Sequence, residues 1–456
     1  MGEETTTKAS KSLFFSKLFL PFFFMLSLMG IAGSALQKSA AVLVGAQLSK
    51  EIAPIVKLIS AFPVMLLIIV FIFFLRKIPI QSWILYVLIS FTVILTVVAL
   101  FLIPNLTKLP SNKLATAVEF LFSGHMGLGL GEAIRQWKLT LTLLIIKFLS
   151  PALFSVLVWA CINQVTQFSE AIKYYIPLAF LSGLPAFFLF STHFFSSVVT
   201  TAPMDHARFL MIGSAVSILL AAFIFRHVSQ SIPQERWMPS KKEGTELQTT
   251  LPIISLSLAI VGFGVIKAFF NESFKTQVQN MIPPGTDYTT LMKQFLTTGN
   301  IGGALVGIVC CIGGPWLLKR FGWCPVALFS PLLLLGSILL FVFGIPFDFS
   351  LLTLGKIHEI LLSGLKMGLL LPLIQIVYLS VPKEFRFRTK GWAELVLAPL
   401  LLSIGNGVIG SLELLKKSAA IVPYFGILSI LTLVIMSLAI YKLSLRRSMD
   451  RVSMID

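Results

Sequence analysis

The sequence predicts an all-α polytopic membrane protein, and its composition supplies two of the three observations behind this prediction. Of the 456 residues, 56% are hydrophobic and only 12% are charged, whereas soluble domains carry about 25% charged and about 45–50% apolar residues. No soluble core could bury this excess, because surface-to-volume scaling leaves too much surface to cover with polar groups. The third observation is a series of apolar runs, each close to the roughly 20 residues that cross a bilayer as a helix.

About twelve such runs follow one another along the chain. Polar or basic connections separate them, and the fourth and eighth runs are interrupted by polar residues and glycines. The first run continues to Lys38 without a small-residue cleavage pattern, so we expect an uncleaved first span. The predicted spans are 13–36, 52–75, 83–104, 138–162, 174–199, 208–228, 251–270, 298–318, 325–346, 354–379, 392–412 and 421–443.

One long polar connection, residues 229–250, divides the predicted spans into two sets of six. We therefore predict an N-terminal six-helix bundle over residues 1–235 and a C-terminal six-helix bundle over 245–456, joined by a cytoplasmic linker over 236–244. Two bundles of this kind are typical of secondary transporters, in which the substrate binds between the halves near the midplane of the bilayer.

The charge distribution predicts the orientation of the chain. The 36 Lys and Arg residues outnumber the 19 Asp and Glu residues, which gives a net charge of +17. More of these cations lie in the connections on the side that holds both termini, so we expect both termini to be cytoplasmic. Orientation and attraction to anionic lipid headgroups explain most of the excess, and no nucleic-acid partner is expected.

Four lysines are placed where orientation does not explain them. Lys147, Lys267 and Lys366 lie within predicted spans, and Lys38 lies at the end of the first. An ammonium at the bilayer centre costs about 2.5–3.5 kcal/mol even on the lenient insertion scale. Lys147 and Lys267 could snorkel to an interface and are candidate buried charges, whereas Lys366 lies near the middle of its span. Since we find almost no carboxylates within the spans, an anionic substrate is the expected partner of these cations.

The other chemistry-bearing residues form no catalytic or metal-binding set in the sequence. The five His are scattered, the four Cys lie in or beside apolar spans without CxxC spacing, and no Walker-type glycine loop is present. We therefore expect a carrier rather than an enzyme, without metal or cofactor, driven by gradients or exchange. Asn163 and Gln164 at the end of the fourth span could hydrogen-bond a ligand or join helices, and both roles stay open.

Several stretches, collinear between residues 30 and 400, resemble a known family. The most specific is WACINQVTQFSEA from Trp159 to Ala171, which fits a W-x-x-x-NQ-x-T-x-x-x-EA pattern. The others are Leu36–Gly45, Ile52–Lys57, Tyr174–Leu178, Phe274-Lys275, Asp287-Tyr288, Lys319–Trp323, Gly364–Lys366 and Tyr378–Lys390. As an ordered set they resemble the nucleotide transporters (ATP/ADP translocases) of plastids and obligate intracellular bacteria.

The resemblance implies a set of substrate-binding residues. These are Lys38, Asn163, Lys275, Lys366, and the basic ladder Arg386, Arg388 and Lys390, which would form a cytoplasmic funnel or gate. The family's acidic partners are largely replaced. Its fourth-span glutamate falls on Lys147, its seventh-span glutamate on Asn271, its D-P-T-K-E element on Leu371–Gln375, and its eleventh-span basic pair on Pro399 and Leu402.

We therefore expect a major-facilitator-like transporter that moves nucleotides, whether ATP/ADP, another nucleotide or a nucleotide cofactor, by alternating access. Transport would be exchange or proton symport, in the inner membrane of an intracellular bacterium, and the expected partners are the nucleotide and the lipid bilayer. The sequence assigns no oligomeric state. The alternative is a divergent carrier of a less charged metabolite, or a membrane scaffold that does not transport.

Overall fold

The computed structural model consists of helices, as the apolar runs predict. It describes most of the chain, and every regular element in the described part is helical. The described residues are 3–48, 61–75, 80–106, 113–122, 125–149, 151–191, 202–237, 288–344, 351–379 and 381–400, with isolated positions between 254 and 270 and between 431 and 438.

The chain forms two compact units, each described here by itself. The first consists of Ser16–Val165 and Ser182–Met238, and the second of Met1–Phe15, Thr166–Leu181 and Pro239–Asp456. Helix α9 (Phe168–Ser191) is divided between them at Leu181.

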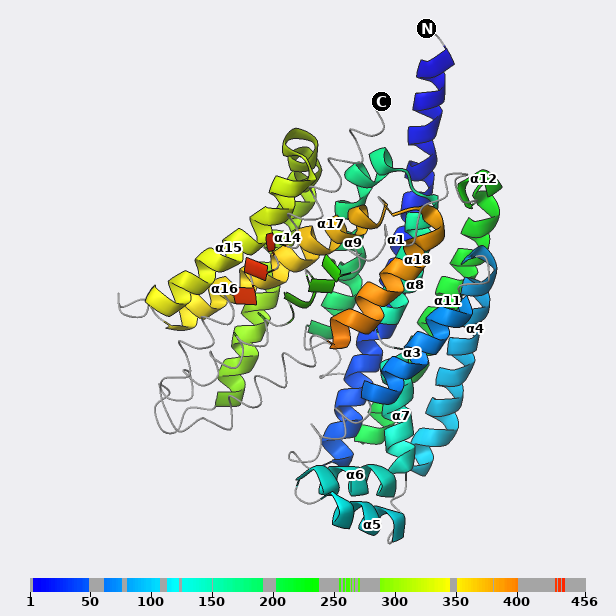
Figure 1. The fold of residues 1–456 in the computed structure, drawn as a ribbon, viewed down its shortest axis with the longest axis vertical. Coiled ribbons are helices and arrows are strands. Elements are labelled where there is room, and N and C mark those ends of the chain that lie inside the picture. Colours follow the sequence, from blue (N-terminus) through cyan, green and yellow to red (C-terminus); the bar gives the residue numbers. More distant parts are fainter. Residues whose placement is uncertain are drawn as a thin grey trace. The chain divides into compact units, whose positions relative to one another are not determined.

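The first unit holds most of α1 (Glu3–Gln47) and the helices of the N-terminal half of the chain (Figure 1). These helices are α3 (Ala61–Leu75), α4 (Ile80–Val97) with its π-helical and 3₁₀ extensions η1 (Val98–Leu102) and η2 (Ile103–Asn105), α5 (Lys113–Leu121), α6 (His125–Arg135), α7 (Trp137–Phe148), α8 (Pro151–Val165), α11 (Pro203–Ser231) and α12 (Gln234–Trp237).

Helix α11 is central to this unit and packs along α4. Its contact with α1 uses small polar side chains in buried positions. Ser214 Oγ donates to the carbonyl of Ala32 at 3.0 Å, and Ser39 Oγ donates to the carbonyl of Ala207 at 3.1 Å. Hydroxyls bonded across helices hold apolar helices together in a membrane, where neighbouring lipid is as apolar as the helix surface.

The second unit is built around α14 (Tyr288–Phe321), which packs along α16 (Leu351–Leu365). Its other helices are α15 (Trp323–Gly344), η4 (Lys366–Leu370), α17 (Leu371–Tyr378), α18 (Lys383–Lys390) and η5 (Gly391–Leu397). Between α14 and α15 the chain turns at Gly322, whose φ of 81° lies in the left-handed region that favours glycine.

Seven helices in the described residues are long and apolar enough to cross a bilayer. They are Lys17–Gln47, Trp83–Asn105, Phe168–Phe190, Pro203–Ser231, Thr297–Phe321, Trp323–Leu340 and Thr353–Tyr378, and they coincide with the first, third, fifth, sixth, eighth, ninth and tenth predicted spans. Large apolar side chains are exposed along them, among them Phe101, Ile312 and Leu332. These surfaces are suited to contact with lipid.

The remaining predicted spans have different outcomes. The second corresponds to a shorter apolar helix, Pro63–Phe73. The fourth, predicted as one helix over 138–162, is wrong in detail because it is divided into α7 and α8. Leu149 leaves helical geometry with a ψ of 27°. Pro151, which begins α8, has no N–H to donate to a carbonyl of α7, so it disfavours one continuous helix. The seventh, eleventh and twelfth lie largely outside the described residues.

Candidate site of the second unit and the family of the chain

Lys366 lies at a change of helix type in the second unit. It is half-buried and begins the π-helical segment η4 between α16 and α17. Such single π-helical turns inside α-helices are frequent at functional sites. Gly364 and Gly368 flank it, and both contact α14: a Cβ on Gly364 would lie 2.7 Å from the carbonyl oxygen of Gly303, and one on Gly368 would lie 2.8 Å from the Cα of Gly307. The lack of a side chain at these two glycines thus lets the backbone of α14 approach.

Lys390 lies in a buried cluster of polar groups in the same unit. Its side chain is only 1% exposed, and its Nζ lies 3.0 Å from Oε1 of Glu394. The ammonium also donates to Oε1 of Gln375 and lies 4.8 Å from the ring centroid of the fully buried Tyr378. Burial lowers the pKa of Lys390, while the Glu394 carboxylate acts in the opposite direction. The cluster therefore joins α17, α18 and η5 through one internally compensated charge.

The basic ladder is a helix, α18, rather than a connecting loop. Arg386 and Lys390 are four residues apart and share one face of it, whereas Arg388 points to the other side. Arg386 donates from Nε to the carbonyl of Val381 at 2.8 Å and from Nη2 to the carbonyl of Leu379 at 2.9 Å. It thereby satisfies carbonyls at the end of α17, and burial lowers its pKa to about 10. The three cations are thus not lined up on one surface.

Lys38 lies in the first unit, on the exposed part of α1. Its Nζ donates to the carbonyl of Phe190 at 2.5 Å and lies 5.5 Å from the centroid of the Phe190 ring. This carbonyl belongs to the last turn of α9, where a cation is favoured because helix C-terminal carbonyls carry partial negative charge. Lys147 is half-buried in the last turn of α7.

Asn163 is buried in α8, with 1% of its surface exposed. The neighbouring Gln164 donates from Nε2 to the carbonyl of Trp237 at 3.3 Å, and Arg236 donates from Nη1 to the carbonyl of Val165 at 3.2 Å. These bonds fasten α12 to the end of α8. Of the two roles left open for the Asn163–Gln164 pair, joining helices is therefore the one that Gln164 performs.

The expectation that the spans hold almost no carboxylates is incomplete. Glu359 lies in the span Thr353–Tyr378 with none of its surface exposed, and it accepts a hydrogen bond from Ser363 Oγ at 3.2 Å. Glu359 precedes Lys366 by seven residues, or about two helical turns, and Glu394 lies near the start of the predicted eleventh span. Both were visible in the sequence as acidic residues within apolar runs, which is the signal that would have found them.

Two predicted cations, Lys267 and Lys275, lie outside the described residues. Within the part of the chain that the structure describes, His, Cys, Asp and Glu form no group that could hold a metal ion. In the second unit the described polar side chains include those of Lys366, Lys390, Gln375, Glu359 and Glu394; in the first they include those of Lys38, Lys147 and Asn163.

The fold defines the class of this protein. A bacterial homologue of the iron transporter ferroportin, in its outward-facing state, is similar with a TM-score of 0.64 and 12% identity, over 94% of this chain and 99% of that one. The major facilitator superfamily proton:xylose symporter XylE is similar with a TM-score of 0.63 and 13% identity, over 95% of each chain. The chain therefore has the fold of major facilitator transporters and is a multi-pass membrane protein.

Sequence comparison then identifies the family. The family model of TLC ATP/ADP transporters matches residues 12–447, so this chain belongs to the TLC ATP/ADP transporter family. The resemblance drawn from the sequence stretches is thus confirmed, and the family is one of transporters.

Relatives within this family are distant. ADP,ATP carrier protein 3 of Rickettsia conorii is 22% identical over 349 residues, which cover 67% of this chain and 69% of that protein. The chloroplastic ADP,ATP carrier protein 2 of Arabidopsis thaliana is 22% identical over 353 residues, which cover 70% of this chain and 55% of that protein. ADP,ATP carrier protein 1 of Chlamydia pneumoniae is 20% identical over 360 residues.

Proposed function

We propose that this protein is a secondary transporter that carries nucleotides across a bacterial plasma membrane by alternating access. The observation that carries the proposal is membership of the ATP/ADP transporter family over residues 12–447, on a major facilitator fold. The named relatives from Rickettsia, Chlamydia and plastids are ADP,ATP carriers. We infer ADP/ATP exchange as the mode of transport, with proton symport as the variant that the test below separates from it. Both termini would be cytoplasmic.

Lys366 is the residue that we expect to matter most for the substrate. A nucleotide carries a polyphosphate, and a lysine ammonium is a compact charge suited to phosphate oxygens. Lys366 is half-buried on a π-helical turn between two glycines that contact α14. This backbone holds its position closely, which is the condition for a preformed phosphate contact.

Lys390 would act differently, because the protein already compensates its charge. Glu394 and Gln375 both contact its ammonium. A phosphate that contacts Lys390 would compete with the Glu394 carboxylate for its ammonium, so that substrate binding would weaken this ion pair. A pair of this kind would make the conformation of α18 and η5 dependent on whether an anion is bound.

The other proposed substrate contacts have less structural support and follow from the family pattern. Lys38 would attract phosphate at the end of α1, and Asn163 would offer a buried amide. Arg386, Arg388 and Lys275 would add positive potential along the path of an anion. Local concentration of an anionic substrate rises along a pathway lined with cations.

A second candidate function is a carrier of a less charged metabolite, or a scaffold that does not transport. The observation in its favour is the apolar character of α17, where the family has the polar D-P-T-K-E element. Leu373 and Ile374 are buried there, with 0% and 3% of their surfaces exposed. The buried side chains of Leu373 and Ile374 offer no polar group to a phosphate, and the amide of Gln375 is already bonded to Lys390.

Uptake into intact bacteria that express the protein tests these alternatives. The labelled panel would contain ATP, ADP, GTP, UTP and NAD, with and without a protonophore and with and without internal nucleotide. Saturable uptake that survives the protonophore and requires internal nucleotide is the expected result and means exchange. Uptake that the protonophore abolishes means proton symport. No uptake of any nucleotide, with the protein shown to be in the membrane, would favour the second candidate.

The variant Lys366→Ala tests the site within the same assay. Hydrogen bonds to charged groups contribute about 1.5–3 kcal/mol, so uptake should fall by roughly tenfold to a hundredfold. Lys356→Ala is the matched control. Lys356 is half-buried like Lys366 but lies in the preceding helix α16, so its variant should retain uptake. Undiminished uptake by Lys366→Ala, at equal membrane abundance, would remove Lys366 from the site.

A further inference from the structure

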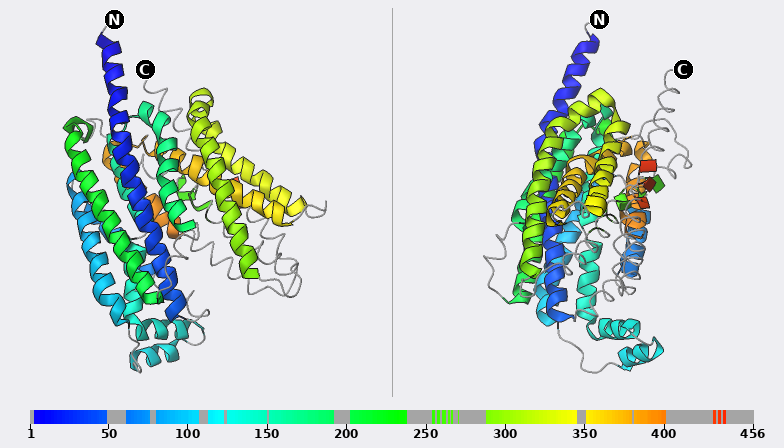
Figure 2. Two further views of the ribbon diagram at one scale, coloured as in Figure 1. Left: turned by 180° about the vertical axis from the view of Figure 1, so that it is seen from behind. Right: turned by 90° about the vertical axis from the view of Figure 1, so that its left-hand side faces the viewer.

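The connection between the third and fourth predicted spans contains a helical hairpin, α5 (Lys113–Leu121) and α6 (His125–Arg135). Both helices run across the end of the first unit, whereas α4 and α11 run along it, and all views agree on this (Figures 1 and 2). The hairpin lies at the opposite end of this unit from α12 (Figure 1). A helix in this orientation lies in the plane of the membrane if α4 and α11 cross it.

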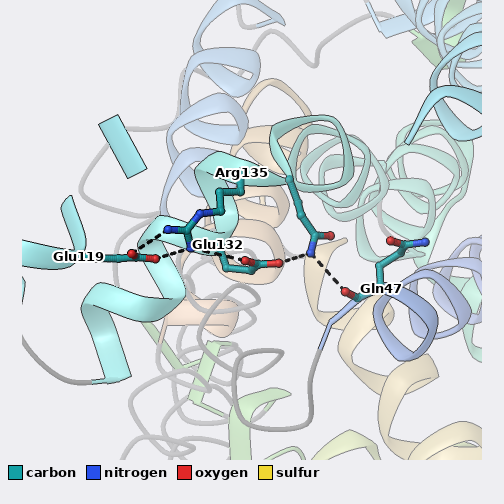
Figure 3. Close-up of polar contacts among 5 residues, drawn as sticks. Gln47, Glu119, Glu132 and Arg135 are labelled. Carbon is teal, nitrogen blue, oxygen red and sulfur yellow. Dashed lines mark hydrogen bonds and ion pairs between the residues drawn. The ribbon is translucent and has the colours of Figure 1, made fainter. Parts of the chain in front are cut away.

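The hairpin is held together by one ion pair and by close helix contact. Arg135 makes two parallel hydrogen bonds to Glu119, with Nη1 at 2.6 Å from Oε1 and Nη2 at 2.8 Å from Oε2 (Figure 3). The hydrogen bond to Glu119 raises the pKa of Arg135. Gly127 and Gly131 of α6 contact α5, since a Cβ on either would collide with Phe122 or Glu119. These contacts give the hairpin a defined geometry.

The network also fixes the hairpin to the end of α1. Arg135 lies 3.8 Å from Glu132, and Gln136 donates from Nε2 both to Glu132 and, at 3.2 Å, to the carbonyl of Gln47 (Figure 3). Gln47 is the last residue of the candidate span Lys17–Gln47. The position of the hairpin is thus set relative to the end of a membrane-crossing helix.

Three helix ends place this position at the membrane surface. The span Trp83–Asn105 ends at Asn105, whose carbonyl accepts a hydrogen bond from Lys138 Nζ at 2.9 Å. Lys138 also lies 5.8 Å from the ring centroid of Trp137, which is 47% exposed and begins α7 two residues after α6 ends. Exposed tryptophan beside lysine is typical of the level of lipid headgroups. The end of α1, the end of η2 and the end of α6 therefore lie close together, at the level of one membrane–water interface.

Helix α5 exposes an apolar face at this level. Ala115 and Glu119 point toward α6, and the opposite face presents Leu114, Phe120 and Leu121, which are 62%, 88% and 73% exposed. Lys113 is the first residue of the helix and is exposed on the same side as Phe120, seven residues later. A lysine at the end of an apolar face can lay its stem on the apolar surface while its ammonium reaches water, as in helices that lie in a bilayer interface.

We propose that α5 is an interfacial helix whose Leu114–Phe120–Leu121 face inserts among phospholipids of the leaflet at this end of the first unit. The exposed apolar surface of the span Trp83–Asn105 supports insertion into lipid, because Phe101 of η1, four residues before the end of that span, is 66% exposed.

Spin labels on the full-length protein in vesicles of phosphatidylcholine with a minority of phosphatidylglycerol test this proposal. Single cysteines would replace Leu114, Phe120 or Leu121 in a background whose four native cysteines are changed to serine. Phe101→Cys is the control for lipid exposure, and Glu235→Cys, exposed on α12, is the control for water. The measurement is the ratio of collisions with oxygen, which concentrates in lipid, to collisions with a water-soluble nickel complex.

The expected collision ratio at all three α5 positions is close to that of Phe101→Cys and several times that of Glu235→Cys. A ratio equal to that of Glu235→Cys would overturn the proposal, and so would labels shielded from both reagents, because protein would then cover the face. If the cysteine-free background does not fold, Phe120→Trp in the native chain provides a second measurement. Its fluorescence should be quenched by brominated phospholipids more strongly than that of Glu235→Trp, and equal quenching would contradict insertion.

Discussion

At the scale of single residues, the central feature is how a charge is placed in an apolar protein. Lys390 is almost fully buried, and its ammonium is compensated by Glu394 and by the amide oxygen of Gln375. A buried ion pair is costly to desolvate, and breaking it by removing one partner costs about 3–5 kcal/mol. Replacing both partners with apolar residues is often neutral. This asymmetry can be measured directly.

We predict that Glu394→Leu lowers the thermal unfolding midpoint of the detergent-solubilised protein strongly, because it leaves the Lys390 ammonium buried beside a neutral amide. The double variant Lys390→Met/Glu394→Leu should recover most of the loss. Intrinsic fluorescence during heating measures both. If the double variant is as unstable as Glu394→Leu alone, the ion pair is not what stabilises this part of the fold.

At the scale of elements, glycines decide how closely helices of the second unit approach. Gly364 of α16 lies so near α14 that an added Cβ would be 2.5 Å from the Cβ of Val306 and 2.7 Å from the carbonyl oxygen of Gly303. Gly336 of α15, by contrast, has nothing within 4 Å of such a Cβ. Two chemically identical changes therefore act in opposite directions.

We expect Gly364→Ala to destabilise the protein by about 1–3 kcal/mol, the usual cost of overpacking. Gly336→Ala should be neutral or stabilising by up to about 1 kcal/mol, because alanine favours a helix over glycine. Thermal unfolding of the two variants under the same conditions gives the comparison. Equal effects would show that the α14–α16 contact is looser than the structure has it.

At the scale of the whole molecule, the arrangement of the chain across the membrane is the main expectation that follows from charge. The N- and C-terminal connections and the central polar linker are rich in Lys and Arg, and such segments stay on the cytoplasmic side. In the structure the end of α1 and the end of α6 lie close together, since Gln136 donates to the carbonyl of Gln47.

We predict that a green fluorescent protein fused to the C-terminus fluoresces in bacteria, whereas alkaline phosphatase fused there is inactive. Phosphatase inserted in the connection 107–112 should be active, because the predicted orientation puts that connection on the opposite side of the membrane. The reverse pattern of activities would mean that both termini face outward and that the positive-inside bias of this chain is misleading.

Much of the fold was predictable because hydropathy is a local property. A run such as 208–228 is apolar whatever lies elsewhere in the chain, and it is found as a helix, α11, at nearly that place. The division of the fourth span at Pro151 was not predicted, because mean hydropathy does not register a change of backbone geometry. The hairpin α5–α6 was not predicted either, because it is held by Arg135 and Glu119 rather than by an apolar run.

The sequence by itself determined that this chain is a membrane protein, where most of its spans lie and to which family it belongs. Each of these rests on residue type summed along the chain or on short ordered motifs. Only the tertiary structure decided that Lys390 is paired with Glu394 and Gln375, that Arg386 caps α17, and that Gly364 contacts α14. These contacts depend on which helices pack together. Desolvation and packing act between residues that are not neighbours in the sequence, so the order of residues alone does not reveal them.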